Sequence, residues 1–160
     1  MIILGIDPGF DRLGYAVLSK EKRGLKLIHS DCLLSEKKLP YEKRLFFLAE
    51  KVGRIITKYH PDILAIEKIF FTKNQKTALR ISEMRGAILY LASSYNLCVL
   101  ELTPLQVKIA ITGYGRAEKS QIQKMIGNEL KIKNKPKYDD ETDAIAIGLT
   151  ASFYLSTIKN

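Results

Sequence analysis

The sequence is poor in cysteine and contains no long apolar run. Its two cysteines, Cys32 and Cys98, lie in apolar stretches without the spacing of metal ligands, so we predict buried free thiols and a cytoplasmic location. No stretch reaches the length of uncharged apolar residues that a membrane span needs. The opening residues MIILGIDPG lack the basic start of a signal peptide and predict a first strand instead.

Acidic residues are also scarce. The chain carries 17 acidic and 26 basic residues, which gives a formal net charge of +9. Such an excess on a small protein indicates a polyanionic partner such as DNA or RNA, with a generally basic solvated surface as the alternative. A protein of the membrane surface would need a basic amphipathic helix, and the sequence contains no convincing one.

The length and composition are typical of one globular domain. With 160 residues, of which 46% are hydrophobic and 27% charged, the chain can bury its own core, and we predict a single domain over residues 1–160. No linker, repeat or low-complexity stretch divides it.

Alternating apolar runs and breaks predict a mixed α/β sheet. Apolar runs predict strands at Ile2–Asp7, Gly14–Ser19, Leu25–Leu34, Ile63–Lys68 and Cys98–Leu102. Helical spacing predicts a helix with its stripe from Leu45 to Tyr59, ended by Pro61, and helices at about Asn74–Tyr95, Leu105–Ile111, Glu118–Leu130 and Asp140–Ser156. The last helix shows one apolar stripe of Ala144, Ile147, Ala151 and Leu155. Strands joined through long helices pair in parallel, whereas the break at 21–24 predicts a hairpin.

Four carboxylates stand at the ends of these elements. Asp7 closes an otherwise apolar strand, and Glu67 lies near the end of another, where an unpaired acid is costly. Asp140 and Asp143 are three residues apart at the start of the last helix and share a face. If the two strands are neighbours and the helix crosses their ends, the four acids converge and repel one another unless divalent cations lie between them. Oxygen ligands favour Mg²⁺ or Mn²⁺, and two such ions can hydrolyse a phosphodiester bond.

Each acid also has a simpler structural interpretation. An aspartate before Pro-Gly is commonly a turn former, so Asp7 alone indicates little. Glu67 could pair with a lysine, and acids in a first helical turn such as Asp140 and Asp143 suit the helix dipole. The combination of two strand acids with an acidic pair on a helix is what favours a metal-dependent nuclease.

Four blocks of the sequence resemble the RuvC family of Holliday-junction resolvases. In chain order they are GIDPGFDRLGYAVL, LAIEKIFFTKNQKTAL, TPLQVKIAITGYGRAEKSQIQKMI and DDETDAIAIGLTAS. Other ribonuclease-H-like and actin-like folds begin with something like the first block, but the third is far more specific. The resemblance implies a ribonuclease-H-like fold with a five-stranded mixed sheet flanked by helices, a homodimer, and nicking of two opposed strands of a four-way DNA junction. It also implies Mg²⁺, two ions per site with Mn²⁺ as a substitute, and cooperation with the RuvA-RuvB branch-migration complex.

The resemblance can be carried over residue by residue. The family's acidic positions, which bind the metal and catalyse cleavage, fall on Asp7, Glu67, Asp140 and Asp143. Its aromatic residue after the catalytic glutamate, which disturbs base stacking near the crossover, falls on Phe70, and its lysines fall on Lys108 and Lys119. The stretch SEMRG departs from the family pattern but retains Arg85-Gly86, and the helix that carries Gly86 is the candidate dimer interface.

The DNA-binding candidates have alternatives of their own. The paired aromatics Phe70 and Phe71 would more commonly pack in a core, while an exposed phenylalanine beside the site would suit wedging between bases. Lys119 starts a helix after a glycine-rich turn, where it can bind phosphate or remain solvated, and Lys108 could equally face solvent. Four further lysines alternate in the loop before Asp140 and would contact phosphates non-specifically: Lys131, Lys133, Lys135 and Lys137. The two histidines, His29 and His60, lack partners at metal spacing and are interpreted as structural or surface residues.

The function that these features favour is a structure-selective DNA endonuclease that resolves Holliday junctions in recombination and repair. One alternative is a related nuclease that acts on RNA with the same carboxylates. A second is a junction-binding protein that does not cleave, which the retention of all four acids disfavours. A third, an actin-like nucleotide-binding fragment, is disfavoured by the short chain and the absence of a second phosphate loop.

Overall fold

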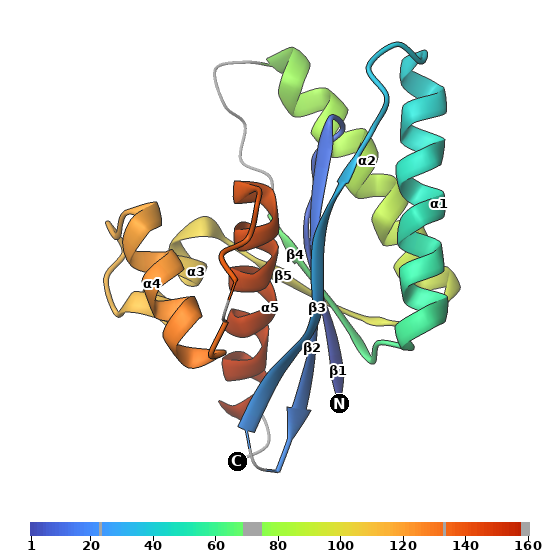
Figure 1. The fold of residues 1–160 in the computed structure, drawn as a ribbon. Helices are drawn as coiled ribbons and strands as arrows, with labels where there is room; N and C mark the ends of the chain where they lie inside the picture. The colour runs from blue at the N-terminus through green and yellow to red at the C-terminus, as the bar shows by residue number, and fades with distance from the viewer. Residues whose placement is uncertain (23, 69–74, 133, 158–160) are drawn as a thin grey trace.

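A five-stranded mixed sheet organises the chain in the computed structural model, which describes residues 1–22, 24–68, 75–132 and 134–157 (Figure 1). The strands lie in the order β3-β2-β1-β4-β5. Their bounds are β1 Ile2–Asp7, β2 Arg12–Glu21, β3 Gly24–Leu34, β4 Ile63–Glu67 and β5 Cys98–Leu102. The helices are α1 Tyr41–Tyr59, α2 Gln75–Ser94, α3 Pro104–Thr112, α4 Lys119–Glu129 and α5 Asp139–Thr157.

The pairing of the strands confirms the predicted mixed sheet. β1 is antiparallel to β2 and parallel to β4, and β4 is parallel to β5. The apolar run of β1 suits this central position, because a helix layer covers each face of the sheet there. β2 is longer than the predicted Gly14–Ser19, since its polar ends continue to pair with β3, from Arg12 with Leu34 to Glu21 with Gly24. Hydrogen bonds between the backbones of the two strands extend β2 beyond its apolar residues, and an apolar pattern cannot predict them.

The helices form two unequal layers. α1 and α2 cover one face of the sheet, while α5 crosses the other face and is itself covered by α3 and α4 (Figure 1). The predicted stripe of α1 is largely buried against the sheet. The residues of the stripe predicted for α5 are buried or packed against the core, and burial extends all round the helix, because every residue from Ala144 to Ala151 lies between the sheet and the outer helices. Among the described residues, no helix combines the length and apolar content that crossing a bilayer requires.

One of the two cysteines differs from its prediction. Both are free thiols, and Cys32 is buried as predicted. Cys98 is exposed, so the prediction of a buried thiol is wrong there. Cys98 begins the edge strand β5, whose first two side chains, Cys98 and Val99, both lie open to solvent. An apolar run at a sheet edge is therefore less buried than the same run in the centre.

The two histidines have structural places, as predicted. His60 ends α1 in the left-handed conformation, and its backbone N–H donates to the carbonyl of Ile56. The ring of His29 stacks on Tyr15, with 5.7 Å between centroids, and meets Tyr59 edge-on.

Close contacts between α5 and the sheet depend on glycine. A Cβ at Gly14 of β2 would collide with the backbone carbonyl of Asp140, and a Cβ at Gly5 of β1 would lie 2.7 Å from the backbone nitrogen of Gly148. Neither backbone atom can yield cheaply, because both belong to the packed helix. These glycines therefore set how closely α5 approaches β1 and β2.

Candidate functional site

The two strand carboxylates are neighbours at one edge of the sheet. β1 and β4 pair in parallel, with Ile6 opposite Ile66, so Asp7 and Glu67 are the last residues of adjacent strands. The carboxyl ends of parallel strands meet at the same edge, where both side chains are partly buried. A shared site was predicted on the condition that these two strands are neighbours, and the order of strands in the sheet meets that condition.

The two helix carboxylates reach the same edge through α5. Asp140 lies in the first turn of α5, and Asp143 follows one turn later on the same face. The backbone of Asp140 packs directly on Gly14, the residue that pairs with Asp7 across β1 and β2. The structure therefore brings together all four acids that the sequence singled out.

The clustering opposes ionisation at the centre of the site. Burial, followed by the charges of Asp143, Glu67 and Asp140, raises the pKa of Asp7 from 3.8 to about 8. Burial and then Asp143 raise the pKa of Glu67 above its ordinary value. Burial also raises the pKa of Asp143, against the opposing effect of Lys119. Without added positive charge, the cluster holds at least one proton that free carboxyls would release near neutral pH.

Two basic side chains lie against the helix acids. The Nζ of Lys119, the first residue of α4, donates to Oδ2 of Asp143 at 3.2 Å and lies 3.9 Å from Oδ2 of Asp139. Burial acts to lower the pKa of Lys119, but Asp143, Asp139 and Asp7 together outweigh it and the pKa rises. The Nε of Arg12 lies 3.1 Å from Oδ2 of Asp140. That oxygen is buried and accepts no hydrogen bond from the described residues, so Arg12 gives it an ion pair alone.

The donor set suits a hard divalent cation. Within the described ranges, no three acidic, histidine or cysteine side chains stand together with the geometry of a finished metal site. The donors are all carboxylate oxygens, the chemistry that Mg²⁺ and Mn²⁺ prefer, and Oδ2 of Asp140 has an unused lone pair. Asp7, Glu67, Asp140 and Asp143 could hold such ions after rotation of their side chains.

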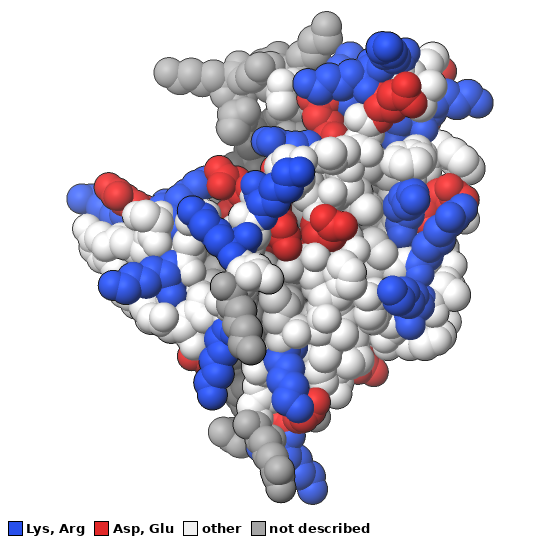
Figure 2. Space-filling model, in the orientation of Figure 1, with Lys and Arg blue, Asp and Glu red and all other residues white. Residues whose placement is uncertain are grey.

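A hollow beside the cluster contains both predicted lysines. Its volume is about 200 Å³, and its lining includes Glu67, Asp143, Lys108 and Lys119. The partly exposed Lys108 of α3 therefore faces the same space as two of the acids. On the face of the molecule that Figure 2 shows, basic side chains are spread widely, with acidic ones in small groups between them.

Some predicted DNA contacts fall outside the described residues or beyond the cluster. Phe70 and Phe71 lie outside the described residues, as does Lys133. Lys131, Lys135 and Lys137 are exposed in the segment before α5, as the sequence predicted.

Besides Arg12, sequence reasoning missed two arginines that support the site. Arg44 of α1 is buried and binds the segment after Asp7: its guanidinium donates to the carbonyl of Phe10 at 3.2 Å, to Ser35, and to the carboxylate of Asp11. Its position four residues before Leu48, in phase with the apolar stripe, was the available signal.

The second missed residue is Arg85 of α2. Its Nε donates to the backbone carbonyl of Glu67 at 3.3 Å, and its guanidinium pairs with Glu101 of β5. Arg85 thereby ties α2 to the end of the strand that carries Glu67. The sequence noted Arg85-Gly86 as a retained motif and assigned it no contact.

Comparison with known proteins gives one consistent result. Residues 3–151 match the family model described as crossover junction endodeoxyribonuclease RuvC. A relative of that name from Petrotoga mobilis is 41% identical over 160 residues, which cover 100% of this chain and 98% of the relative. Another, from Halothermothrix orenii, is 44% identical over 93% of this chain and 90% of its own length.

Solved structures agree with the sequence matches. The RuvC structure of Thermus thermophilus superposes with a TM-score of 0.90 at 29% identity, covering 98% of this chain and 96% of that one. The same protein in complex with a Holliday junction substrate gives a TM-score of 0.89 at 27% identity over the same shares. The yeast mitochondrial Holliday junction resolvase Ydc2 shares the fold, with a TM-score of 0.73 at 15% identity, and covers 98% of this chain and 80% of its own.

Proposed function

Because this chain belongs to the family of crossover junction endodeoxyribonucleases RuvC, we propose that it resolves Holliday junctions by nicking two opposed strands. Residues 1–160 would act as one ribonuclease-H-like nuclease domain. The convergence of four carboxylates at one sheet edge is the observation that supports the chemistry, and the relatives' shared name supports the substrate.

The site is suited to hydrolysis of a phosphodiester bond. A proton held on Asp7 is released when positive charge enters the cluster, because its raised pKa arises from burial and from three neighbouring acids. The four acids would then be ionised together and could hold two Mg²⁺ ions, or Mn²⁺ in their place. When bound, such a pair activates a water molecule and stabilises the leaving oxygen.

The basic residues around the cluster would bind the DNA backbone. Lys119 is exposed at the start of α4, beside the acids, and Lys108 borders the same hollow. A phosphate held between them would lie next to Glu67 and Asp143. We assign Phe70, the third residue after Glu67, to the base-stacking role that the family resemblance implies.

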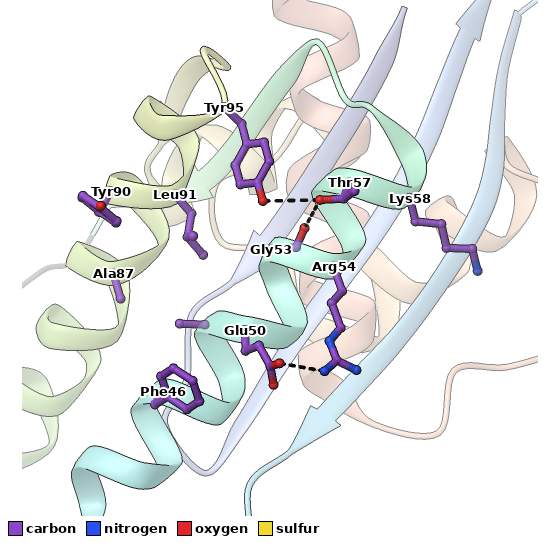
Figure 3. A pocket seen from close by; sticks show the side chains of 11 residues that line it. Phe46, Glu50, Gly53, Arg54, Thr57, Lys58, Ala87, Tyr90, Leu91 and Tyr95 are labelled. Carbon is purple, nitrogen blue, oxygen red and sulfur yellow. Dashed lines mark hydrogen bonds and ion pairs between the residues drawn. The ribbon is translucent and has the colours of Figure 1, made fainter.

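A symmetric homodimer would match the two equivalent strands of a junction. The exposed side of α2 is our candidate interface, because Leu79 and Tyr90 are 62% and 72% exposed and Gly86 between them has open space around it. This exposed side of α2 adjoins a groove of about 640 Å³ between α1 and α2, which Phe46 and Tyr90 border (Figure 3). In a monomer these aromatic side chains would remain in water.

A contact between side chains joins the two walls of the groove between α1 and α2. The hydroxyl of Thr57 lies 3.3 Å from that of Tyr95 and donates to the carbonyl of Gly53, which joins the two helices at one end (Figure 3). The contact between Thr57 and Tyr95 therefore links α1 to the residue that follows α2, at one end of the proposed interface. Sedimentation at micromolar concentration should give a dimer, and Tyr90→Asp should give a monomer. A monomeric unmodified chain, with and without DNA, would argue strongly against this interface.

Further proposals follow from the substrate and the family. We propose that the chain acts in the cytoplasm, where its DNA substrate is found, and that it works with the RuvA-RuvB branch-migration complex. Stimulation of junction cleavage by added RuvA and RuvB proteins would test this partnership.

A cleavage assay on matched substrates tests the function. Labelled four-way DNA junction, linear duplex of the same sequence, and RNA duplex are incubated with the protein and Mg²⁺, and nicks are mapped on each strand. We expect paired nicks in opposed strands of the junction and little cleavage of either duplex. Preferential RNA cleavage would favour the alternative nuclease, and tight junction binding without nicks would favour a non-cleaving protein.

A further inference from the structure

Arg12 occupies an unusual place beside the acid cluster. It is the first residue of β2, and its backbone is fixed by pairing with Leu34 of β3. Its side chain is 52% exposed, yet the Nε lies 3.1 Å from the buried Oδ2 of Asp140. The guanidinium also lies over the ring of Tyr138, 5.9 Å from the centroid. A long side chain on a fixed strand can change partners without any movement of the backbone.

The pair between Arg12 and Asp140 satisfies charge but not hydrogen bonding. Oδ2 of Asp140 is buried, and none of the described residues donates a hydrogen bond to it. A positive charge at 3.1 Å from a carboxylate oxygen opposes the approach of a divalent cation to that oxygen. The cation and the guanidinium therefore compete for Asp140.

A second partner for Arg12 is available on the open side of the site. Arg12 and Asp140 line a hollow of about 420 Å³, with Phe10 and the exposed Lys37 on its other walls. The remaining acid there, Asp11, is already paired with Arg44. Once a cation takes Asp140, the free charges that the described residues bring to this hollow are those of Arg12 and Lys37, which suits a phosphate. A guanidinium binds phosphate through two parallel N–H donors.

We propose that Arg12 is a counterion that exchanges partners. It neutralises Asp140 in the metal-free protein, and it binds a phosphate of the DNA strand in the adjacent hollow once a divalent cation has taken Asp140. This inference rests on the proposed function, because it requires that the acid cluster binds metal and that DNA lies beside it. Metal binding and DNA binding are then coupled through one side chain, and each strengthens the other.

The first measurement is the affinity of the DNA-free protein for Mn²⁺. It is determined from the electron paramagnetic resonance signal of the Mn²⁺ that stays unbound. Arg12→Gln should bind Mn²⁺ about ten-fold more tightly than the unmodified chain, because a competing charge is gone, a change equal to about 1.4 kcal/mol. Arg12→Lys keeps the charge and should stay near the original affinity. Equal Mn²⁺ affinities of Arg12→Gln and the unmodified chain would overturn the proposal.

The second measurement is the affinity for an intact four-way junction, by fluorescence anisotropy, in EDTA and in Ca²⁺, with intact strands verified on a denaturing gel. The unmodified chain should gain affinity when Ca²⁺ is added, and Arg12→Gln should lose most of that gain. Lys26→Gln serves as the matched control, because Lys26 is exposed and ion-paired with Glu21 at the opposite end of β2. A full Ca²⁺-dependent gain in Arg12→Gln would contradict the exchange of partners.

One further variant separates this inference from the proposed function. Asp143→Asn removes an acid of the cluster and leaves the Arg12–Asp140 pair intact. If Asp143→Asn weakens Mn²⁺ binding while Arg12→Gln leaves it unchanged, the metal site stands and the exchange is wrong. If Asp143→Asn binds Mn²⁺ like the unmodified chain, the acid cluster is not the metal site, and the proposed function fails with it.

Discussion

The strand acids and the helix acids of this site are held in different ways. Asp7 and Glu67 end two adjacent central strands, and their pKa values are raised first by burial. Asp140 and Asp143 sit on the first turns of a helix, and each lies within 3.2 Å of a basic side chain. Among the described residues, no ion pair to either strand acid is found, whereas each helix acid already has a counterion that a cation must displace.

This difference separates what is rigid in the site from what is exchangeable. The strand positions are fixed by the hydrogen-bonded register of β1, β2 and β4. The helix positions depend on how α5 packs against Gly14, and their ion pairs can be replaced side chain by side chain. Changes to each half should therefore have different consequences for cleavage, binding and stability.

The largest effect is expected from removing the central strand charge. Asp7→Asn should reduce Mg²⁺-dependent nicking by about a hundred-fold or more, the scale typical of losing one group of a catalytic site. Junction affinity should persist or increase, because a negative charge that faces the phosphates is gone. Nicking and junction affinity are measured on the same preparation.

The other three acids provide the comparison for this variant. Glu67→Gln, Asp140→Asn and Asp143→Asn should each impair nicking, and double variants should lose little more than single ones, since all four serve one site. Full nicking by folded Asp7→Asn would contradict the mechanism and favour a turn-forming role for that residue.

A smaller effect is expected from moving the helix acids away from the strand acids while all four acids remain. In Gly14→Ala the new Cβ would strike the backbone of Asp140, so α5 must shift away from β1 and β2. Overpacking of this kind costs about 1–3 kcal/mol, and we expect nicking to fall by roughly ten-fold or more, since small misplacement of a reacting group is costly. Thermal unfolding and nicking are both measured.

Gly127→Ala is the matched control, because a Cβ at this position of α4 meets nothing within 4 Å. This variant should keep its activity, and its Tm should stay the same or rise slightly, because alanine favours a helix more than glycine does. If Gly14→Ala behaves in the same way, close packing of α5 is not what brings the helix acids to the strand acids.

Removing the counterion of Asp143 should have a moderate effect. We expect Lys119→Ala to weaken junction binding or slow nicking several-fold more than Lys22→Ala, a change in the exposed turn between β2 and β3. If Lys119 neutralises one phosphate, the slope of log affinity against log salt should decrease by about 0.9. Equal effects of the two substitutions would exclude the phosphate-binding role.

The smallest effect concerns stability in the absence of metal. The folded-state pKa of Asp7, about 8, lies above its ordinary value of 3.8, so the folded state binds the proton more tightly. The stability that this proton provides is present at low pH and is lost as the pH rises through 8. In EDTA, the Tm of Asp7→Asn should exceed that of the unmodified chain by an amount that grows between pH 7 and 9.

The expected growth is a few degrees, since 1 kcal/mol shifts the Tm by roughly 2–4 °C in a chain of this size. Glu36→Gln removes an exposed acid outside the cluster and controls for net charge. A Tm difference for Asp7→Asn that stays constant with pH would show that burial and the neighbouring acids do not hold a proton on Asp7.

The sequence by itself determined the elements, the mixed sheet and the four acids. Apolar runs that end in a single carboxylate can be recognised from the sequence. They mark candidate sites, because an acid at the end of a buried strand is costly unless its charge is compensated. The resemblance to the family then placed its acidic positions on these same residues. Local pattern was sufficient wherever the cause was local: a turn, a helical stripe or a cap.

Only the tertiary structure decided which charges meet. Arg12 and Arg44 each lie far in sequence from the acid that they pair with, which is Asp140 for Arg12 and Asp11 for Arg44. Their roles depend on how β2, α1 and α5 pack together. The exposure of Cys98 and the burial of α5 on two sides likewise depend on strand order and on the outer helices. Periodicity reports which residues share a face but not what covers that face, because packing partners are chosen by the whole chain.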